Sequence, residues 1–181
     1  MTTEAVPDAL FDAALDQMQD LIDATRPDQM ALPTPCDDWD VRALINHIVG
    51  GPAGFAARAS GKTAGWSAPQ GDLLGDDPAA AFRAARRSLE AAFLEYPQAA
   101  GQSRPFMIGE SAVHAWDLAQ ATGQVARLDP ALAEAGLAVL RTVLTAERRA
   151  GSDAFGPEVP VSPDAPAYLR LAGFLGRQPL G

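Results

Sequence analysis

The chain has 181 residues, of which 48% are hydrophobic and 20% are charged, a composition typical of one globular domain. Its net charge of -9 excludes the basic face that nucleic acid or an anionic membrane surface requires, so we expect neither as a partner. Because no apolar run approaches the ~20 residues that span a bilayer, and the N-terminus lacks the pattern of a secretory signal, we expect a cytoplasmic protein.

Helical periodicity starts close to the N-terminus. Within residues 8–24, large apolar side chains recur every three or four positions: Phe11, Leu15, Met18 and Ile22. Aspartates fill positions between them, which predicts an amphipathic first helix. Two prolines exclude a helix from the segment before Asp40, which is a favoured N-cap residue. A second helix is predicted from residue 41, and Gly50-Gly51-Pro52 either kinks it or ends it.

The middle of the chain alternates loops and helices. Residues 60–76 are rich in glycine, which predicts a surface loop long enough to cover a site. Asp77-Pro78 joins an N-cap residue to a proline at the first helical position, and it predicts a third helix that ends before Pro97. We predict a further loop over residues 98–106 and a fourth helix from about Met107 to Thr122, closed by Gly123.

The C-terminal part begins with a second cap-and-proline signal at Asp129-Pro130, which predicts a fifth helix to about Ala150. Residues 155–163 look extended, and a short helix is predicted around Tyr168–Leu175. We therefore expect a metal-binding helical bundle over residues 1–150 and a tail over residues 151–181 that packs on it without forming a separate domain. Five helical patterns and no alternating strand pattern predict an all-α fold, an antiparallel bundle.

Both histidines of the chain fall in the middle of predicted helices. Glu110 and His114 are four residues apart, so their side chains leave one face of the fourth helix about one turn apart. Asp117 extends that face, either as an acceptor that orients an imidazole or as an alternative ligand. If the second helix is a neighbour of the fourth, His47 completes a set of two imidazoles and one carboxylate, suited to Zn, Ni, Fe or Mn.

Three protein ligands would leave one position of a tetrahedral site open to water or a thiolate. In the alternative interpretation, each histidine is a core residue satisfied by a hydrogen bond. Glu110 is then a solvated charge near a helix start, where the helix dipole favours it. Spacing alone does not decide between these interpretations.

Two blocks of sequence carry a family resemblance. Residues 32–47, LPTPCDDWDVRALINH, and residues 110–123, ESAVHAWDLAQATG, together resemble the metal-binding domain of mycothiol-dependent maleylpyruvate isomerases. That domain belongs to the DinB-like four-helix bundles, and the likeness covers about residues 8–150. The family's first histidine and later Glu-x-x-x-His bind zinc or a similar ion, so the resemblance implies His47, Glu110 and His114 as ligands, with Zn favoured over Ni, Fe or Mn.

The resemblance also implies a cofactor and a reaction. A low-molecular-weight thiol such as mycothiol would reach the metal, become a thiolate, and attack a small electrophile in an S-transfer or a cis-trans isomerisation. The family's full isomerase has a further C-terminal domain, whereas residues 151–181 alone follow the bundle here. We therefore expect related thiol chemistry rather than maleylpyruvate isomerisation itself.

Other residues in or near the matched blocks have two interpretations each. Cys36, the single cysteine, cannot form an internal disulfide, which agrees with a reducing compartment. It is either a redox partner of a bound thiol or a small apolar residue that packs below the second helix. Trp39 and Trp116 are expected to be core aromatic residues. Three arginines of the third helix meet an acidic cofactor or form a solvated face: Arg83, Arg86 and Arg87.

The sequence therefore supports three functions. The leading one is a metal-dependent, thiol-using S-transferase or isomerase of small electrophiles, with an open coordination position beside a pocket that residues 60–76 cover. The main alternative is a non-catalytic metal-binding module for sensing or stress response that uses the same ligands. A third is an interaction domain without metal. No residue is assigned a catalytic role, the substrate is open, and the oligomeric state is open with a homodimer as one alternative.

Overall fold

The computed structural model describes residues 8–36, 39–62, 71–150 and 155–180. Seven α-helices and two short 3-10 helices account for most of this part of the chain, and its residues form no β-strand beyond one isolated bridge between Pro33 and Asp40. The predicted all-α fold is confirmed. Among the helices in these ranges, none has both the length and the apolar character needed to cross a bilayer.

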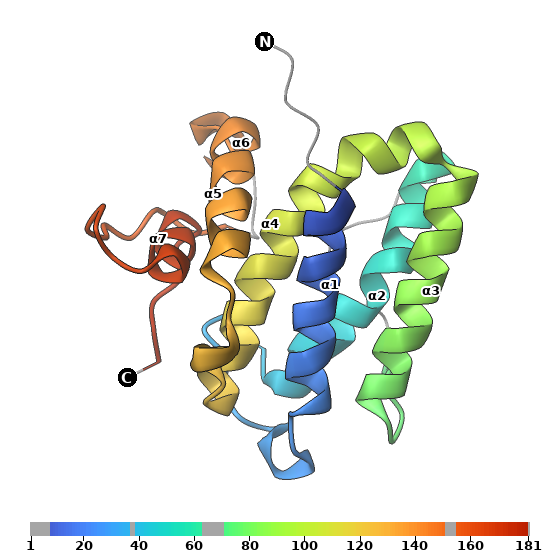
Figure 1. Cartoon of the computed structure of the whole chain (residues 1–181), viewed down its shortest axis with the longest axis horizontal. Helices are drawn as coiled ribbons and strands as arrows, with labels where there is room; N and C mark the ends of the chain where they lie inside the picture. The colour runs from blue at the N-terminus through green and yellow to red at the C-terminus, as the bar shows by residue number, and fades with distance from the viewer. Residues whose placement is uncertain (1–7, 37–38, 63–70, 151–154, 181) are drawn as a thin grey trace.

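Four long helices form the bundle: α1 (Asp8–Asp23), α2 (Val41–Ala59), α3 (Pro78–Glu95) and α4 (Pro97–Thr122). Figure 1 shows that α1 and α2 run in opposite directions, as do α3 and α4, whereas α2 and α3 run the same way. The side chain of Asn46 ties the segment before α3 to α2, because it donates to the Gly71 carbonyl at 2.8 Å and accepts from the Leu73 N–H at 2.7 Å. The bundle therefore consists of two antiparallel pairs joined by one long crossover.

The helix boundaries follow the predicted caps. Asp40, Asp77 and Asp129 each accept a backbone N–H of the first turn that they precede, at 2.8–2.9 Å. Gly123 closes α4 in the left-handed conformation, with φ at 74°. The short 3-10 helices η1 (Pro27–Gln29) and η2 (Val125–Arg127) follow α1 and α4. These predicted caps are confirmed.

One prediction for the long helices was wrong, and another had left two alternatives open. Residues 98–106 are helical, because α4 begins at Pro97 directly after Tyr96, and the loop predicted there does not exist. Pro105 lacks the N–H that would reach the Gly101 carbonyl, yet the helix continues through it, and Figure 1 shows α4 crossing the top of the bundle before it descends. In α2, Pro52 is likewise inside the helix, which continues to Ala59.

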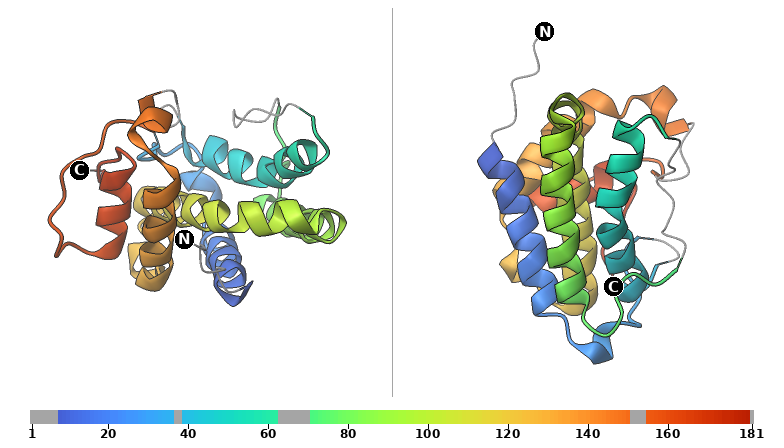
Figure 2. Two further views of the ribbon diagram at one scale, coloured as in Figure 1. Left: turned by 90° about the horizontal axis from the view of Figure 1, so that it is seen from above. Right: turned by 90° about the vertical axis from the view of Figure 1, so that its right-hand side faces the viewer.

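The C-terminal helices differ slightly from the prediction. The fifth helix, α5 (Pro130–Val143), ends before Ala150 because Leu144 leaves the helical conformation, and α6 (Ala146–Ala150) follows as a separate short helix. The last helix, α7 (Ala167–Phe174), begins and ends one residue before the predicted span of Tyr168–Leu175. Figure 2 shows α5 and α7 to one side of α4, with α1 on its other side.

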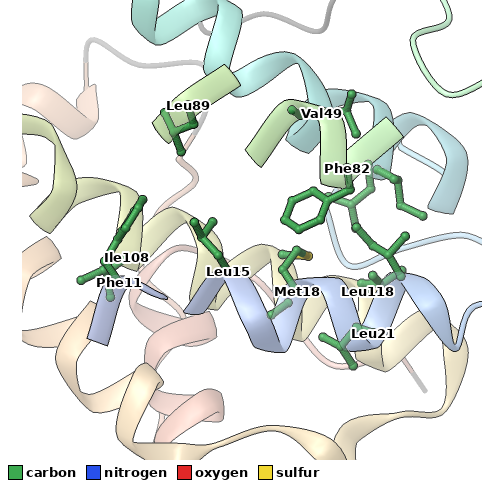
Figure 3. Packing of buried hydrophobic residues seen from close by; sticks show 14 of the residues in the cluster. Phe11, Leu15, Met18, Leu21, Val49, Phe82, Leu89, Ile108 and Leu118 are labelled. Atoms are coloured by element: carbon green, nitrogen blue, oxygen red, sulfur yellow. The ribbon is translucent and has the colours of Figure 1, made fainter. Parts of the chain in front are cut away.

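The helix α4 separates two apolar cores. The first lies between α1, α2, α3 and α4, and Figure 3 shows part of it: Phe11, Leu15, Met18, Leu21, Val49, Phe82, Leu89, Ile108 and Leu118. The second lies between α4, α5 and α7 and includes Trp116, Leu140 and Leu171. Because α4 faces both cores, its sequence is apolar nearly all round. The predicted tail helix packs on α4 and α5, while the division of the chain at residue 150 stays a prediction.

A close approach of α4 and α5 fixes their contact. A Cβ added to Gly136 would lie 3.1 Å from the Cα of Gly109, and one added to Gly109 would lie 2.6 Å from the Cγ of Leu140. Leu140 is fully buried, so it has little room to move. Glycine at position 109 is therefore required by packing, although it lowers helix propensity.

We expect Gly109→Ala to lower the free energy of unfolding by about 1–2 kcal/mol. Because the added Cβ would lie 2.6 Å from a fully buried side chain, we place the cost of overpacking against Leu140 at about 2–3 kcal/mol, the upper part of the usual range. This cost outweighs the ~1 kcal/mol that alanine gains in helix propensity. The control is Gly101→Ala in the same helix, where an added Cβ meets nothing within 4 Å and should raise stability. Urea denaturation measures both variants, and equal stabilisation by both would contradict the packing argument.

Candidate metal centre

The segment before α2 folds back across the start of that helix. The N–H of Val41 donates to the carbonyl of Leu32 at 3.0 Å, and the hydroxyl of Thr34 donates to the carbonyl of Trp39 at 2.9 Å. These bonds hold Cys36 and Trp39 beside α2, although Asp37 and Asp38 of the same motif lie outside the described residues. A stretch with two prolines thus obtains a defined shape from backbone and hydroxyl hydrogen bonds instead of from a helix.

Three predicted ligands converge from α2 and α4. The ligand atoms of His47, Glu110 and His114 all lie within 4.8 Å of one another. The Nε2 atom of His114 is 3.7 Å from a carboxylate oxygen of Glu110, and the two imidazole rings meet edge-on with centroids 5.0 Å apart. This agrees with the predicted one-turn spacing of Glu110 and His114 and with the predicted neighbourhood of α2 and α4.

A hydrogen bond fixes the orientation of His114. Its Nδ1 atom lies 3.1 Å from a carboxylate oxygen of Asp117, which is fully buried. Because an ionised carboxylate only accepts, Nδ1 carries the proton and donates it, and in the neutral ring the lone pair is on Nε2, which faces Glu110. Asp117 is thus placed to orient this imidazole, while its role beside a metal ion stays a prediction.

A residue that the sequence analysis missed completes this network. Arg177, which follows α7, is only 8% exposed, and its Nε lies 3.1 Å from both carboxylate oxygens of Asp117. Its Nη2 lies 3.7 Å from the sulfur of Cys36. The sequence holds no local signal for this role, because Arg177 lies 60 residues from Asp117 and has no periodic relation to it.

In the part of the chain that the structure describes, two groups of side chains could hold a metal ion: His47 with Glu110 and His114, and Cys36 with His114 and Asp117. In the second group the guanidinium of Arg177 already supplies a positive charge. In the first, Oε1 of Glu110 is buried and has no hydrogen-bond partner among the described residues. An unpaired buried carboxylate oxygen is costly, so this atom fits a cation that approaches between the imidazoles. The His47 group is therefore the one that suits a divalent ion.

The environment prepares these groups for that role. Burial, followed by the proximity of His114, lowers the pKa of His47 to about 4, so its imidazole is neutral near pH 7 and free to bind a metal. Burial alone would raise the pKa of Glu110, but its contact with a protonated His114 outweighs this and holds the pKa below its ordinary value. Burial likewise opposes the charged form of His114, but its contacts with Asp117 and Glu110 raise its pKa, so a divalent ion would take the place of the proton on Nε2. Burial raises the pKa of the Cys36 thiol to about 11, despite the nearby Arg177.

The remaining predicted residues fall into two groups. Trp39 packs at a tilt against two candidate ligands, with its ring centroid 4.5 Å from that of His47 and 6.1 Å from that of His114, whereas Trp116 is a buried core residue as expected. The arginines of α3 do not reach the site: Arg83 and Arg86 pair with Asp23 and Asp16 of α1, and Arg87 is exposed. In the predicted covering loop, residues 63–70 lie outside the described ones.

Comparisons with known proteins agree with this picture. A family model described as the mycothiol maleylpyruvate isomerase N-terminal domain matches residues 11–122, which include all three candidate ligands. Two proteins of Mycobacterium tuberculosis, from strains CDC 1551 / Oshkosh and ATCC 25618 / H37Rv and both described as uncharacterized, are each 35% identical over 173 residues. Each match covers 91% of this chain and 93% of the relative. No solved structure matches.

We expect Arg177→Ala to lower the free energy of unfolding by about 3–5 kcal/mol, because it leaves the buried carboxylate of Asp117 without its charged partner. The matched control is Arg170→Ala in α7, which removes a partly exposed pair with Glu134 and should cost about 0–1 kcal/mol. Urea denaturation compares the two. A loss at Arg177 as small as that at Arg170 would show that Asp117 does not depend on the guanidinium.

Proposed function

The chain belongs to the mycothiol maleylpyruvate isomerase N-terminal domain family, and from this premise we propose a function in metal-dependent thiol chemistry. In this proposal His47, Glu110 and His114 hold one divalent metal ion, with Zn the favoured metal and Ni, Fe or Mn as alternatives. A low-molecular-weight thiol of the mycothiol type is the co-substrate. The reaction is an S-transfer to, or a cis-trans isomerisation of, a small electrophile.

The buried, unpaired Oε1 atom of Glu110 is the observation that carries this proposal. A carboxylate oxygen in that position needs a donor or a cation, and the described residues around it supply two imidazoles whose ligand atoms lie within 4.8 Å. A divalent ion satisfies the carboxylate and both histidines at once, whereas a structural core with no metal leaves the oxygen unsatisfied. This favours the metal centre over the interaction domain without metal.

The charges around the candidate centre favour an anionic co-substrate. Glu110 and Asp117 are carboxylates and Arg177 is a guanidinium, so these three groups together carry one negative charge. A divalent ion at this position gives the centre one positive charge, and it lowers the pKa of a thiol that coordinates it enough to form a thiolate near neutral pH. Coordination of a thiolate would bring the total charge of the centre to zero, whereas a water ligand would leave it at one positive charge.

The side chains around this position have distinct parts in the proposed reaction. Asp117 keeps the proton on Nδ1 of His114, so that Nε2 faces Glu110, and Arg177 holds Asp117 in place. Trp39 packs at a tilt against both imidazole rings and so restricts their positions. Cys36 stays protonated near neutral pH because burial raises the pKa of its thiol, so the attacking sulfur comes from the co-substrate. That sulfur would form a bond to the electrophilic carbon as the bond from this carbon to a leaving group breaks. With an activated double bond, the π bond breaks instead and the neighbouring carbon takes up the proton that the thiol released.

Metal analysis of protein purified without a His tag tests the centre. We expect close to one ion per wild-type chain, and a loss of affinity of more than roughly 100-fold in His47→Ala and Glu110→Gln, since removal of an outer hydrogen-bond partner alone costs 10–100-fold. Glu90→Gln is the matched control, because Glu90 is an exposed glutamate of α3 that pairs with Arg86. Equally poor metal content in the wild type and in His47→Ala would refute the centre.

An assay of thiol conjugation separates the enzyme from the non-catalytic alternative. Metal-loaded protein with mycothiol and a panel of small electrophiles should form thioether products or isomerise cis-trans substrates. The rates should drop to background in Glu110→Gln and remain in Glu90→Gln. Stoichiometric metal with no turnover across the panel would instead support a sensor or stress-response module that uses the same ligands.

A further inference from the structure

Two donor clusters share one histidine in this protein. His114 faces Glu110 with Nε2 and Asp117 with Nδ1, and it belongs both to the His47 group and to a second group with Cys36 and Asp117. A thiolate, an imidazole and a carboxylate are also a donor set for zinc, and a sulfur ligand binds such soft or borderline ions well. The fold thus offers a divalent ion two adjacent positions with different chemistry.

The side chain of Arg177 occupies the second position. Its Nε contacts both oxygens of Asp117 at 3.1 Å, its Nη2 is 3.7 Å from the sulfur of Cys36, and the residue is 8% exposed. The guanidinium therefore supplies the cation that these donors would otherwise take from solution. A second positive ion placed beside it would meet strong repulsion in a buried environment.

The backbone of the tail aims Arg177 at this position. Gly176 adopts a left-handed conformation with φ at 84°, and the N–H of Arg177 donates to the Ala172 carbonyl at 2.9 Å at the end of α7. A Cβ on Gly176 would lie 2.9 Å from the backbone of Gly156 and from the carbonyl oxygen of Pro157. The direction of the arginine side chain is thus set by a turn that only glycine accommodates.

We propose that Arg177 is a positioning residue that selects between the two clusters: by filling the Cys36, His114 and Asp117 cluster with its guanidinium, it confines the divalent ion to His47, Glu110 and His114. This inference rests on the proposed function. Its consequence is that the protein's own sulfur stays out of the coordination shell. The vacant coordination position is then kept for the sulfur of an external thiol.

Cobalt(II) absorption spectroscopy tests the inference, because a sulfur ligand adds an intense near-ultraviolet charge-transfer band that imidazole and carboxylate ligands do not give. Wild-type protein loaded with cobalt alone should lack this band, and its spectrum should match that of Cys36→Ser. Arg177→Met and Arg177→Gln, which remove the charge, should acquire the band. The double variant Arg177→Gln/Cys36→Ser should lose it again, and Arg177→Lys, which retains a cation, should resemble the wild type.

Each result supports or overturns the inference. The inference is overturned if the wild type shows a band that depends on Cys36. It is also overturned if a folded Arg177→Gln variant binds cobalt without that band. Either result leaves the proposed function intact. Absence of cobalt binding by the wild type would refute both. Circular dichroism reports whether the charge-removing variants fold, and the Gln variant can still donate a hydrogen bond to Asp117. If neither folds, a Cys36-dependent band in the wild type or in Arg177→Lys, both of which retain the cation, still overturns the inference.

Discussion

The buried carboxylate of Asp117 is the constraint on which the rest of this molecule depends. A charge with no exposure to water is tolerated only when other groups pair with it, and here His114 and Arg177 do so. The first partner is on the same helix, and the second comes from the tail. The need to satisfy one carboxylate thereby joins the central helix, the C-terminal segment and the candidate ligands into a single arrangement.

The central helix α4 gives that arrangement its place. It packs on α1, α2 and α3 through one face and on α5 and α7 through another, so both apolar cores meet along it. Glu110, His114 and Asp117 emerge between these cores, where α2 and the segment with Cys36 and Trp39 approach. A polar cluster at such a seam is held by side chains from several elements, which gives it the fixed geometry that metal ligands require.

Local signals in the sequence predicted much of this fold. The caps at Asp40, Asp77 and Asp129 and the terminal glycine of α4 set helix boundaries because they act within one turn. The loop predicted over residues 98–106 was wrong, because Pro97 begins α4 instead of only ending the helix before it, and α4 continues through Pro105. At the site, spacing predicted the pair of Glu110 and His114, and the resemblance supplied His47. The pairing of Arg177 with Asp117 could not be predicted, because it arises from the packing of a distant tail.

The close packing of Trp39 against the two histidines has a consequence for the fluorescence of the protein. Its indole ring lies close to both imidazoles, and indole emission responds to charge and to heavy atoms in its immediate surroundings. Any change in the protonation or ligation of His47 or His114 takes place within a few ångströms of this ring. The protein therefore contains a native fluorophore beside its candidate centre. Its intrinsic fluorescence reports on the state of that centre without any added label.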